Sequence, residues 1–139
     1  MNRTLPTGPL LAAVSLAGSL SIPAQELMFR ETENKTRSYV EVTSMFSKLP
    51  GSGYAPVRVT IVNRSDLDRS ISLNFRSTDG FYGRNGSEMR SNFGLSAAAG
   101  QTEEADFLVP VTTALNAAHG GQLSLRVDMG GDFGNAMAR

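Results

Sequence analysis

The single histidine of this 139-residue chain, His119, is the first place to look for catalysis. A Ser–His–Asp hydrolase would need it, because the imidazole of such a triad takes the serine proton. His119 lies in the stretch NAAHGG, and no G-x-S-x-G sequence, which would hold a nucleophilic serine on a sharp turn, precedes it. At the end of a short helix an imidazolium is stabilised by the helix dipole. We therefore expect His119 to have a capping or surface role, and one imidazole is too few for a histidine-based metal site.

Two groups of oxygen-bearing side chains raise the question of calcium. Asp66 and Asp68 flank a leucine, and Asp128, Asp132 and Asn135 lie close together near the C-terminus. Calcium takes about six to eight oxygen ligands, and neither group matches an EF-hand loop or a glycine-rich calcium-binding repeat. Side chains of this kind also hydrogen-bond to the backbone of turns. We expect turn formation at both places and no metal site.

Carboxylate pairs and thiolates are the remaining catalytic options. Glu103 and Glu104 are adjacent, so on a strand they point to opposite faces and cannot form a general acid/base pair with each other. A pair with a remote acid such as Glu88 or Asp79 stays open, although no other residue supports it. Cysteine is absent, which excludes thiolate catalysis, cysteine-ligated zinc and iron–sulfur clusters. We predict that the protein is not an enzyme and has no cofactor.

The loop DGFYGRNG, residues 79–86, is the predicted binding surface. Its two aromatic residues stand among glycines and polar residues, without a strand pattern that would bury both. An exposed aromatic ring beside an arginine and an asparagine can stack on a sugar or anchor a protein partner. The candidate residues are Phe81, Tyr82, Arg84 and Asn85. The alternative is that one ring folds over the end of the domain while the other lies on the surface.

The N-terminal 24 residues have the pattern of a secretory signal peptide. The basic Arg3 precedes a run of small and apolar residues from Leu10 to Leu20, and the expected cleavage site follows Ala24. An uncleaved amphipathic helix or an anchor is the alternative. The pattern predicts a periplasmic, cell-surface or secreted protein whose mature chain has no transmembrane span. Lys plus Arg and Asp plus Glu both number 13, so the charge is balanced and no nucleic-acid partner is expected.

The mature chain has the period-two alternation of half-buried strands. Val57, Val59 and Ile61 alternate with polar residues, and after the turn stretch NRSDLDR the pattern continues in SISLNF. Leu27 and Phe29 indicate a short first strand. Four further sets of apolar residues follow the same pattern: Val40, Val42 and Phe46; Met89, Phe93 and Leu95; Phe107, Val109 and Val111; and Leu123, Leu125, Val127 and Met129. About seven strands in roughly 105 residues predict an all-β antiparallel sandwich.

Two local features and the domain boundaries complete the predicted organisation. The stretch TTALNAAHGG predicts a helix of about two turns, capped by Thr112 or Thr113, and Pro110 predicts an edge strand or a bulge because proline has no amide hydrogen. We expect a signal peptide over residues 1–24, a β-sandwich domain over 25–131 and a flexible tail or linker over 132–139.

The stretches GYAPVRVTIVN, SISLNF, FGLSAAAGQTEEADFLVPV and LSLRVDMGG together resemble the N-terminal immunoglobulin-like sandwich of bacterial exported or membrane-anchored proteins. The resemblance covers about residues 38–131. It implies a binding, spacing or adhesion module attached to something larger, and it transfers no catalytic residues. Fold alone does not determine function.

The expected function is therefore a non-catalytic interaction or spacer module outside the cytoplasm, for a protein or glycan partner at the cell envelope. One alternative is an accessory domain of a larger exported enzyme or membrane-anchored assembly. The other is a small secreted hydrolase. An edge left open for a donated strand is a further question that the sequence leaves unanswered.

Overall fold

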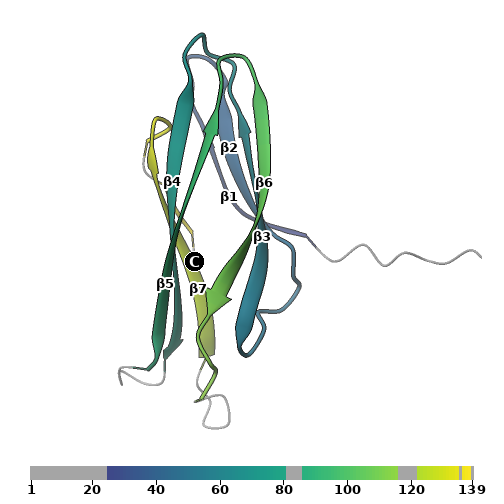
Figure 1. The fold of residues 1–139 in the computed structure, drawn as a ribbon, viewed down its shortest axis with the longest axis vertical. Helices are drawn as coiled ribbons and strands as arrows, with labels where there is room; N and C mark the ends of the chain where they lie inside the picture. Colours follow the sequence, from purple (N-terminus) through teal and green to yellow (C-terminus); the bar gives the residue numbers. More distant parts are fainter. Residues whose placement is uncertain (1–24, 81–85, 116–121, 135, 139) are drawn as a thin grey trace, which may run out of the picture.

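The computed structural model describes residues 25–80, 86–115, 122–134 and 136–138 (Figure 1). The predicted signal peptide, the candidate residues Phe81, Tyr82, Arg84 and Asn85, and His119 lie outside the described residues. The predicted domain boundaries stay predictions. In the part of the chain that is described, no helix is long and apolar enough to cross a membrane.

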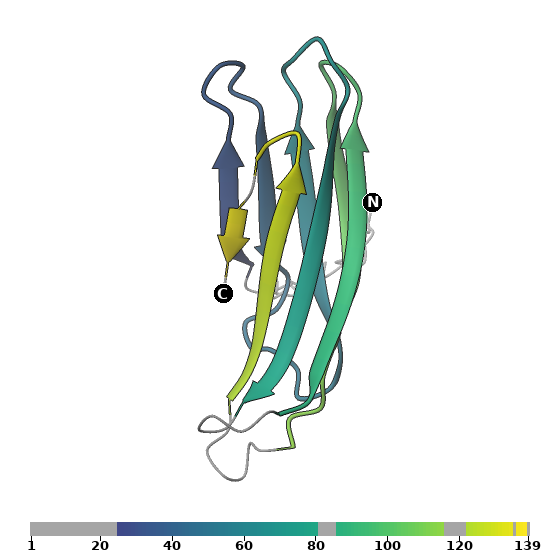
Figure 2. The ribbon, with the colours of Figure 1, turned by 90° about the vertical axis from the view of Figure 1, so that its left-hand side faces the viewer.

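The fold is all-β, with two antiparallel sheets packed face to face (Figures 1 and 2). One sheet has the strand order β1-β2-β3-β6 and the other has β5-β4-β7-β8, and we call them sheet A and sheet B. Seven of these strands have six to twelve residues: β1 (Glu26–Thr32), β2 (Tyr39–Ser44), β3 (Gly53–Val62), β4 (Arg69–Gly80), β5 (Glu88–Ala97), β6 (Thr102–Val111) and β7 (Gln122–Gly131). The last strand, β8 (Ala136–Ala138), has three. The predicted β-sandwich is confirmed at this level.

The core lies between the sheets, where the alternating apolar residues predicted it. Val57, Val59 and Ile61 of β3 are buried against Leu73 and Phe75 of β4 and their neighbours. Burying an aliphatic or aromatic side chain contributes roughly 1.5–3 kcal/mol, so these strands account for much of the stability.

The prediction for β5 is only partly right. Phe93 and Leu95 are partly buried against the core, and the Phe93 ring contacts Phe75 edge-on at 5.8 Å and Phe107 at 4.6 Å between ring centroids. Met89, which we expected on the same buried face, is 41% exposed. It is the second residue of β5, the edge strand of sheet B, so fewer neighbours cover it.

The turn between β3 and β4 is organised by the buried Asn63. Its Nδ2 donates to the carbonyl oxygens of Leu67, Ala97 and Ala98 at 2.8, 3.1 and 3.0 Å. Its Oδ1 accepts from the amide and the hydroxyl of Ser65 at 3.1 and 2.7 Å. This one side chain ties the predicted β3–β4 turn to the turn that follows β5.

Two predictions concern the stretch around β6. Pro110 lies on an edge strand, as expected, because β6 is the last strand of sheet A. Residues 112–115 are not helical, so the start of the predicted helix is wrong there, and residues 116–121 lie outside the described part. The Ala114 amide instead donates to the Gly51 carbonyl at 2.8 Å, which holds this segment against the β2–β3 loop rather than in a helical turn.

Candidate functional site

The acidic residues considered for catalysis do not come together. Glu103 lies opposite Ile61 of β3, and Glu104 lies opposite Thr60. Because Glu103 and Glu104 are consecutive in a strand, their side chains face opposite sides of sheet A. Glu88 is exposed and forms an ion pair with Arg90. Asp79 is buried, and its Oδ2 accepts from the Leu115 amide at 2.9 Å, so it holds a loop in place.

Two of the acids considered for calcium, Asp68 and Asp132, accept hydrogen bonds from the backbone, whereas Asp128 accepts from the Arg126 side chain. Asp68 Oδ1 accepts from the Ala99 amide at 3.0 Å. Asp132 Oδ2 accepts from the amide and the hydroxyl of Ser70 at 2.7 and 3.2 Å, and these bonds hold the pKa of Asp132 below its usual value. Within the described ranges, no group of three or more His, Cys, Asp or Glu residues is arranged to hold a metal ion. Asn135 is not among the described residues.

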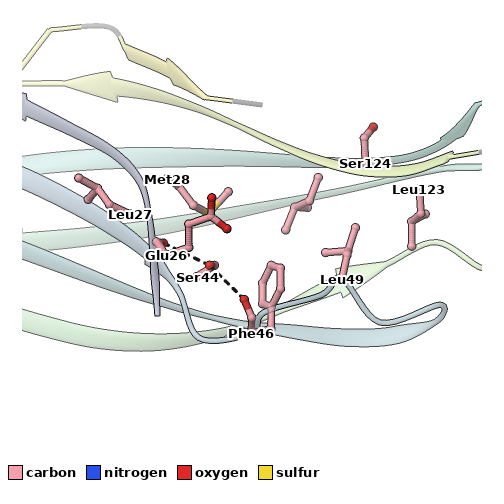
Figure 3. Close-up of a pocket in the computed structure, with 9 residues that line it drawn as sticks. Glu26, Leu27, Met28, Ser44, Phe46, Leu49, Leu123 and Ser124 are labelled. Carbon is pink, nitrogen blue, oxygen red and sulfur yellow. Dashed lines mark hydrogen bonds between the residues drawn. The ribbon is translucent and has the colours of Figure 1, made fainter. Parts of the chain in front are cut away.

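A pocket of about 280 Å³ opens between the two sheets, on the side that β1 and β7 border (Figure 3). Six of its nine lining residues are apolar. It is lined by Glu26, Leu27, Met28, Ser44, Phe46, Leu49, Leu123, Ser124 and Leu125. These residues come from β1, the end of β2, the β2–β3 loop and β7, so both sheets contribute.

The pocket wall on the sheet A side is held by Ser44. Its hydroxyl donates to the carbonyl oxygens of Glu26 and Phe46 at 3.2 and 3.4 Å (Figure 3). These bonds join the start of β1 to the chain that leaves β2. Leu27, which lines the pocket, remains 54% exposed. The pocket is therefore formed but not covered.

Among the described residues, the backbone edge of β7 beside this pocket is only partly paired. β8 pairs with Val127, Asp128 and Met129 only, whereas β7 begins at Gln122. Along the same edge, residues 122–126 of β7 pair with no strand in the part of the chain that the structure describes. Sheet A is also incomplete here, because the pairing of β2 with β3 stops at Val57 while β3 begins at Gly53. The two sheets thus leave a gap on one side of the sandwich.

A second exposed apolar surface lies on the outer face of sheet A. Tyr54 and Leu108 are 63% and 64% exposed, and they stand opposite Pro110 and Pro56 across the β3–β6 pair. Four apolar side chains on one face form a small patch, and such patches occur at contact surfaces. β6 is the edge strand of sheet A, so this patch also lies beside backbone that pairs with no further strand among the described residues. The two surfaces differ because residues from both sheets line the pocket, whereas the patch lies on sheet A alone.

Sequence reasoning missed the pocket and the open edge. The alternation of Leu123, Leu125 and Val127 predicted a strand, but it does not tell a central strand from an edge strand. The deciding fact is that β8 covers three residues of a ten-residue neighbour. The only sequence signal is the pair of glycines at 130 and 131, which precede the turn back into β8.

Comparison with known proteins adds no family to this description. No protein-family model matches the chain, and no curated protein matches it.

Proposed function

We propose that this chain is a non-catalytic β-sandwich interaction module that works outside the cytoplasm of a bacterium. It binds a protein partner by accepting an extended strand of that partner at residues 122–126 of β7. The observation that carries the proposal is the open edge of β7 lying directly beside an apolar, uncovered pocket.

An open strand edge favours pairing with another strand. Its free N–H and C=O groups form a template, and proteins usually block such edges with charges, prolines or a covering segment. Adding a strand to an edge gives affinity through main-chain hydrogen bonds and specificity through pockets for alternate side chains. The edge of β7 has both parts, because Leu123 and Leu125 of the open stretch line the pocket.

The short strand β8 defines the direction and register of an added strand. Ala138 pairs with Val127 in an antiparallel ladder. A strand that continues this ladder places one residue opposite Leu125 and the next but one opposite Leu123. Because residues directly opposite each other point to the same face, those two partner residues face the pocket and should be apolar.

The proposal includes an immunoglobulin-like connection of the strands. In such sandwiches strands A, B and E share one sheet, and strands C, F and G share the other. The order β2-β3-β6 corresponds to A, B and E, and the order β4-β7-β8 corresponds to C, F and G. In this correspondence β8 takes the place of strand G, so the partner strand would complete the region where G is short.

The location and the absence of catalysis rest on the sequence. Export is supported by the pattern of residues 1–24, and the non-catalytic role by the single histidine and the missing nucleophile motif. Asp79, the one buried carboxylate among the described residues, accepts a hydrogen bond from a loop amide, which supports a structural role.

The proposal is tested with two extensions of residues 25–139 that have the same composition. One adds Val-Thr-Val-Thr, which places both valines opposite Leu125 and Leu123, and the other adds Thr-Val-Thr-Val, which turns them to solvent. We expect the first variant to melt at a temperature higher by roughly 4 °C or more, since docking two valines should yield about 1 kcal/mol net of the ordering cost.

Two controls keep the result specific. Melting temperatures that do not change with protein concentration show that the added strand pairs within its own molecule. Leu123→Lys places a charge in the pocket and should remove the difference between the two extensions. Equal melting temperatures for the two extensions in the unsubstituted protein would show that the edge of β7 does not accept a strand.

A further inference from the structure

Three arginines form a row across the outer face of sheet B. Arg76 of β4 lies directly opposite Arg90 of β5 and directly opposite Arg126 of β7. All three point away from the core, because the neighbours of Arg76, Phe75 and Ser77, are fully buried. Figure 2 shows β5, β4 and β7 side by side on this face, and we call the three residues the arginine row.

The charges of the row are only partly balanced. Arg90 forms an ion pair with Glu88, and the Arg126 Nε donates to Asp128 Oδ1 at 3.0 Å. The central Arg76 forms no ion pair with any residue in the described part of the chain. The central guanidinium group of the row therefore has no carboxylate partner among the described residues. Like charges directly opposite each other on a sheet are destabilising, so the row has an unfavourable arrangement that a bound anion would relieve.

A hollow of about 300 Å³ lies beside the row. It is lined by Arg76 and Arg126 together with Thr78, Glu88 and Ser124. The Thr78 and Ser124 hydroxyls lie 2.8 Å apart, so the hollow contains two hydroxyls next to two guanidinium groups. Guanidinium groups bind the oxygens of sulfate, phosphate and carboxylate through paired hydrogen bonds, and hydroxyls can donate one more. The Glu88 carboxylate also lines the hollow, but it is paired with Arg90. The remaining groups of the hollow can donate hydrogen bonds to an oxyanion.

The neighbouring row supplies groups that bind sugars. Asn74 and Asn92 lie opposite each other next to the arginine row, and the Asn74 Nδ2 donates to the Asn92 Oδ1 at 2.7 Å. Both side chains are exposed. Amide groups offer both donors and acceptors, which suits sugar hydroxyls. A single cationic row beside an amide row does not provide the long basic track that nucleic acids require.

We propose that the arginine row binds the sulfate or carboxylate groups of an acidic polysaccharide. The guanidinium groups of Arg76 and Arg126 hold the oxyanion in the hollow, while Asn74 and Asn92 hydrogen-bond to the hydroxyls of the same chain. This site lies on the face of sheet B, whereas the strand-accepting edge lies at its side. The proposal is therefore independent of the strand-binding function.

The test measures retention of the protein in gels that contain dextran sulfate, polygalacturonate or uncharged dextran. We expect binding to at least one of the two acidic polymers and none to uncharged dextran. Arg76→Gln should weaken that binding roughly tenfold, the effect of losing a hydrogen-bonded charge. Arg58→Gln is the matched control, since Arg58 is also a cross-strand arginine but lies on sheet A and pairs with Asp106 at 2.7 Å. It should change binding by less than about twofold.

The source of the oxyanion is distinguished by competition. If sodium sulfate displaces the protein more strongly than sodium chloride of equal ionic strength, the row recognises a single oxyanion group. If the two salts act alike, recognition requires the polymer, and the proposal holds in that form. Equal losses in Arg76→Gln and Arg58→Gln, tighter binding to a DNA duplex than to either acidic polymer, or binding to uncharged dextran would each overturn it.

Discussion

Replacing Arg76 by glutamine should make the protein more stable, although it removes a charged side chain from a folded strand. The substitution keeps a long polar side chain on the outer face of β4 and removes the positive charge between Arg90 and Arg126. Most substitutions destabilise proteins, so a gain would be an unusual result with a specific cause.

The magnitude follows from the two cross-strand pairs. Each directly opposite pair of like charges costs roughly 0.2–1 kcal/mol. Two pairs give about 0.4–2 kcal/mol, and the lower half of this range applies because Glu88 and Asp128 already offset part of the charge. We expect a gain of about 0.5–1 kcal/mol at low salt, which is a rise in melting temperature of roughly 2–6 °C for a domain of this size.

The assay is thermal unfolding by circular dichroism in about 20 mM and about 500 mM sodium chloride. Salt screens exposed charges, so the gain of Arg76→Gln should shrink strongly at the higher concentration. Arg58→Gln should show no gain at either salt, because Arg58 is held by Asp106 through two hydrogen bonds of 2.7 and 2.9 Å. A loss of stability in Arg76→Gln, or a gain that salt leaves unchanged, would refute the argument that the arginine row repels itself.

Three further predictions concern the framework. Asn63→Ala should cost about 3 kcal/mol in urea unfolding, because it removes five buried or partly buried hydrogen bonds, and a cost below about 1 kcal/mol would contradict the role given to this side chain. Gly131→Ala should destabilise the protein more than Gly134→Ala. Both glycines have a positive φ, but only at Gly131 would an added Cβ lie 2.5 Å from a carbonyl oxygen. Equal losses of stability would mean that the backbone angle φ alone, and not the close carbonyl, causes the destabilisation. The free energy of unfolding should fall as the pH drops below about 4. Hydrogen bonds lower the pKa of Asp132 in the folded state, so the carboxylate stabilises the fold at any pH above its pKa in the unfolded chain. That stabilisation is lost as the pH falls through the pKa of Asp132 in the folded state. Asp132→Asn should flatten this slope, and an unchanged slope would exclude the carboxylate as its source.

The parts of the fold that could be predicted are those in which each strand has a buried face. Val57, Val59 and Ile61 show the alternation of such a strand, and burial in a sandwich requires that alternation. Pro110 indicated its edge strand because proline lacks the donor that a central strand needs. Met89 was misassigned because alternation alone does not show how far the opposite sheet extends.

The candidate surfaces could not be predicted, because they depend on which strands become neighbours. Arg76, Arg90 and Arg126 are far apart in the sequence and meet only through the register of three strands. The open stretch of β7 likewise depends on the length and register of β8. The loop that we favoured from sequence, with Phe81 and Tyr82, lies outside the described residues, so its role stays a prediction.

The central claim, that β7 accepts a strand beside the pocket, is tested most directly by amide hydrogen exchange. The amides of residues 122–126 are compared between the two extensions, Val-Thr-Val-Thr and Thr-Val-Thr-Val, which have equal composition and opposite phase. When a strand pairs along this edge of β7, the amides that point toward that strand gain a hydrogen-bond acceptor. We therefore expect these amides to exchange more slowly with the first extension only. Exchange rates that are the same in both variants would contradict it.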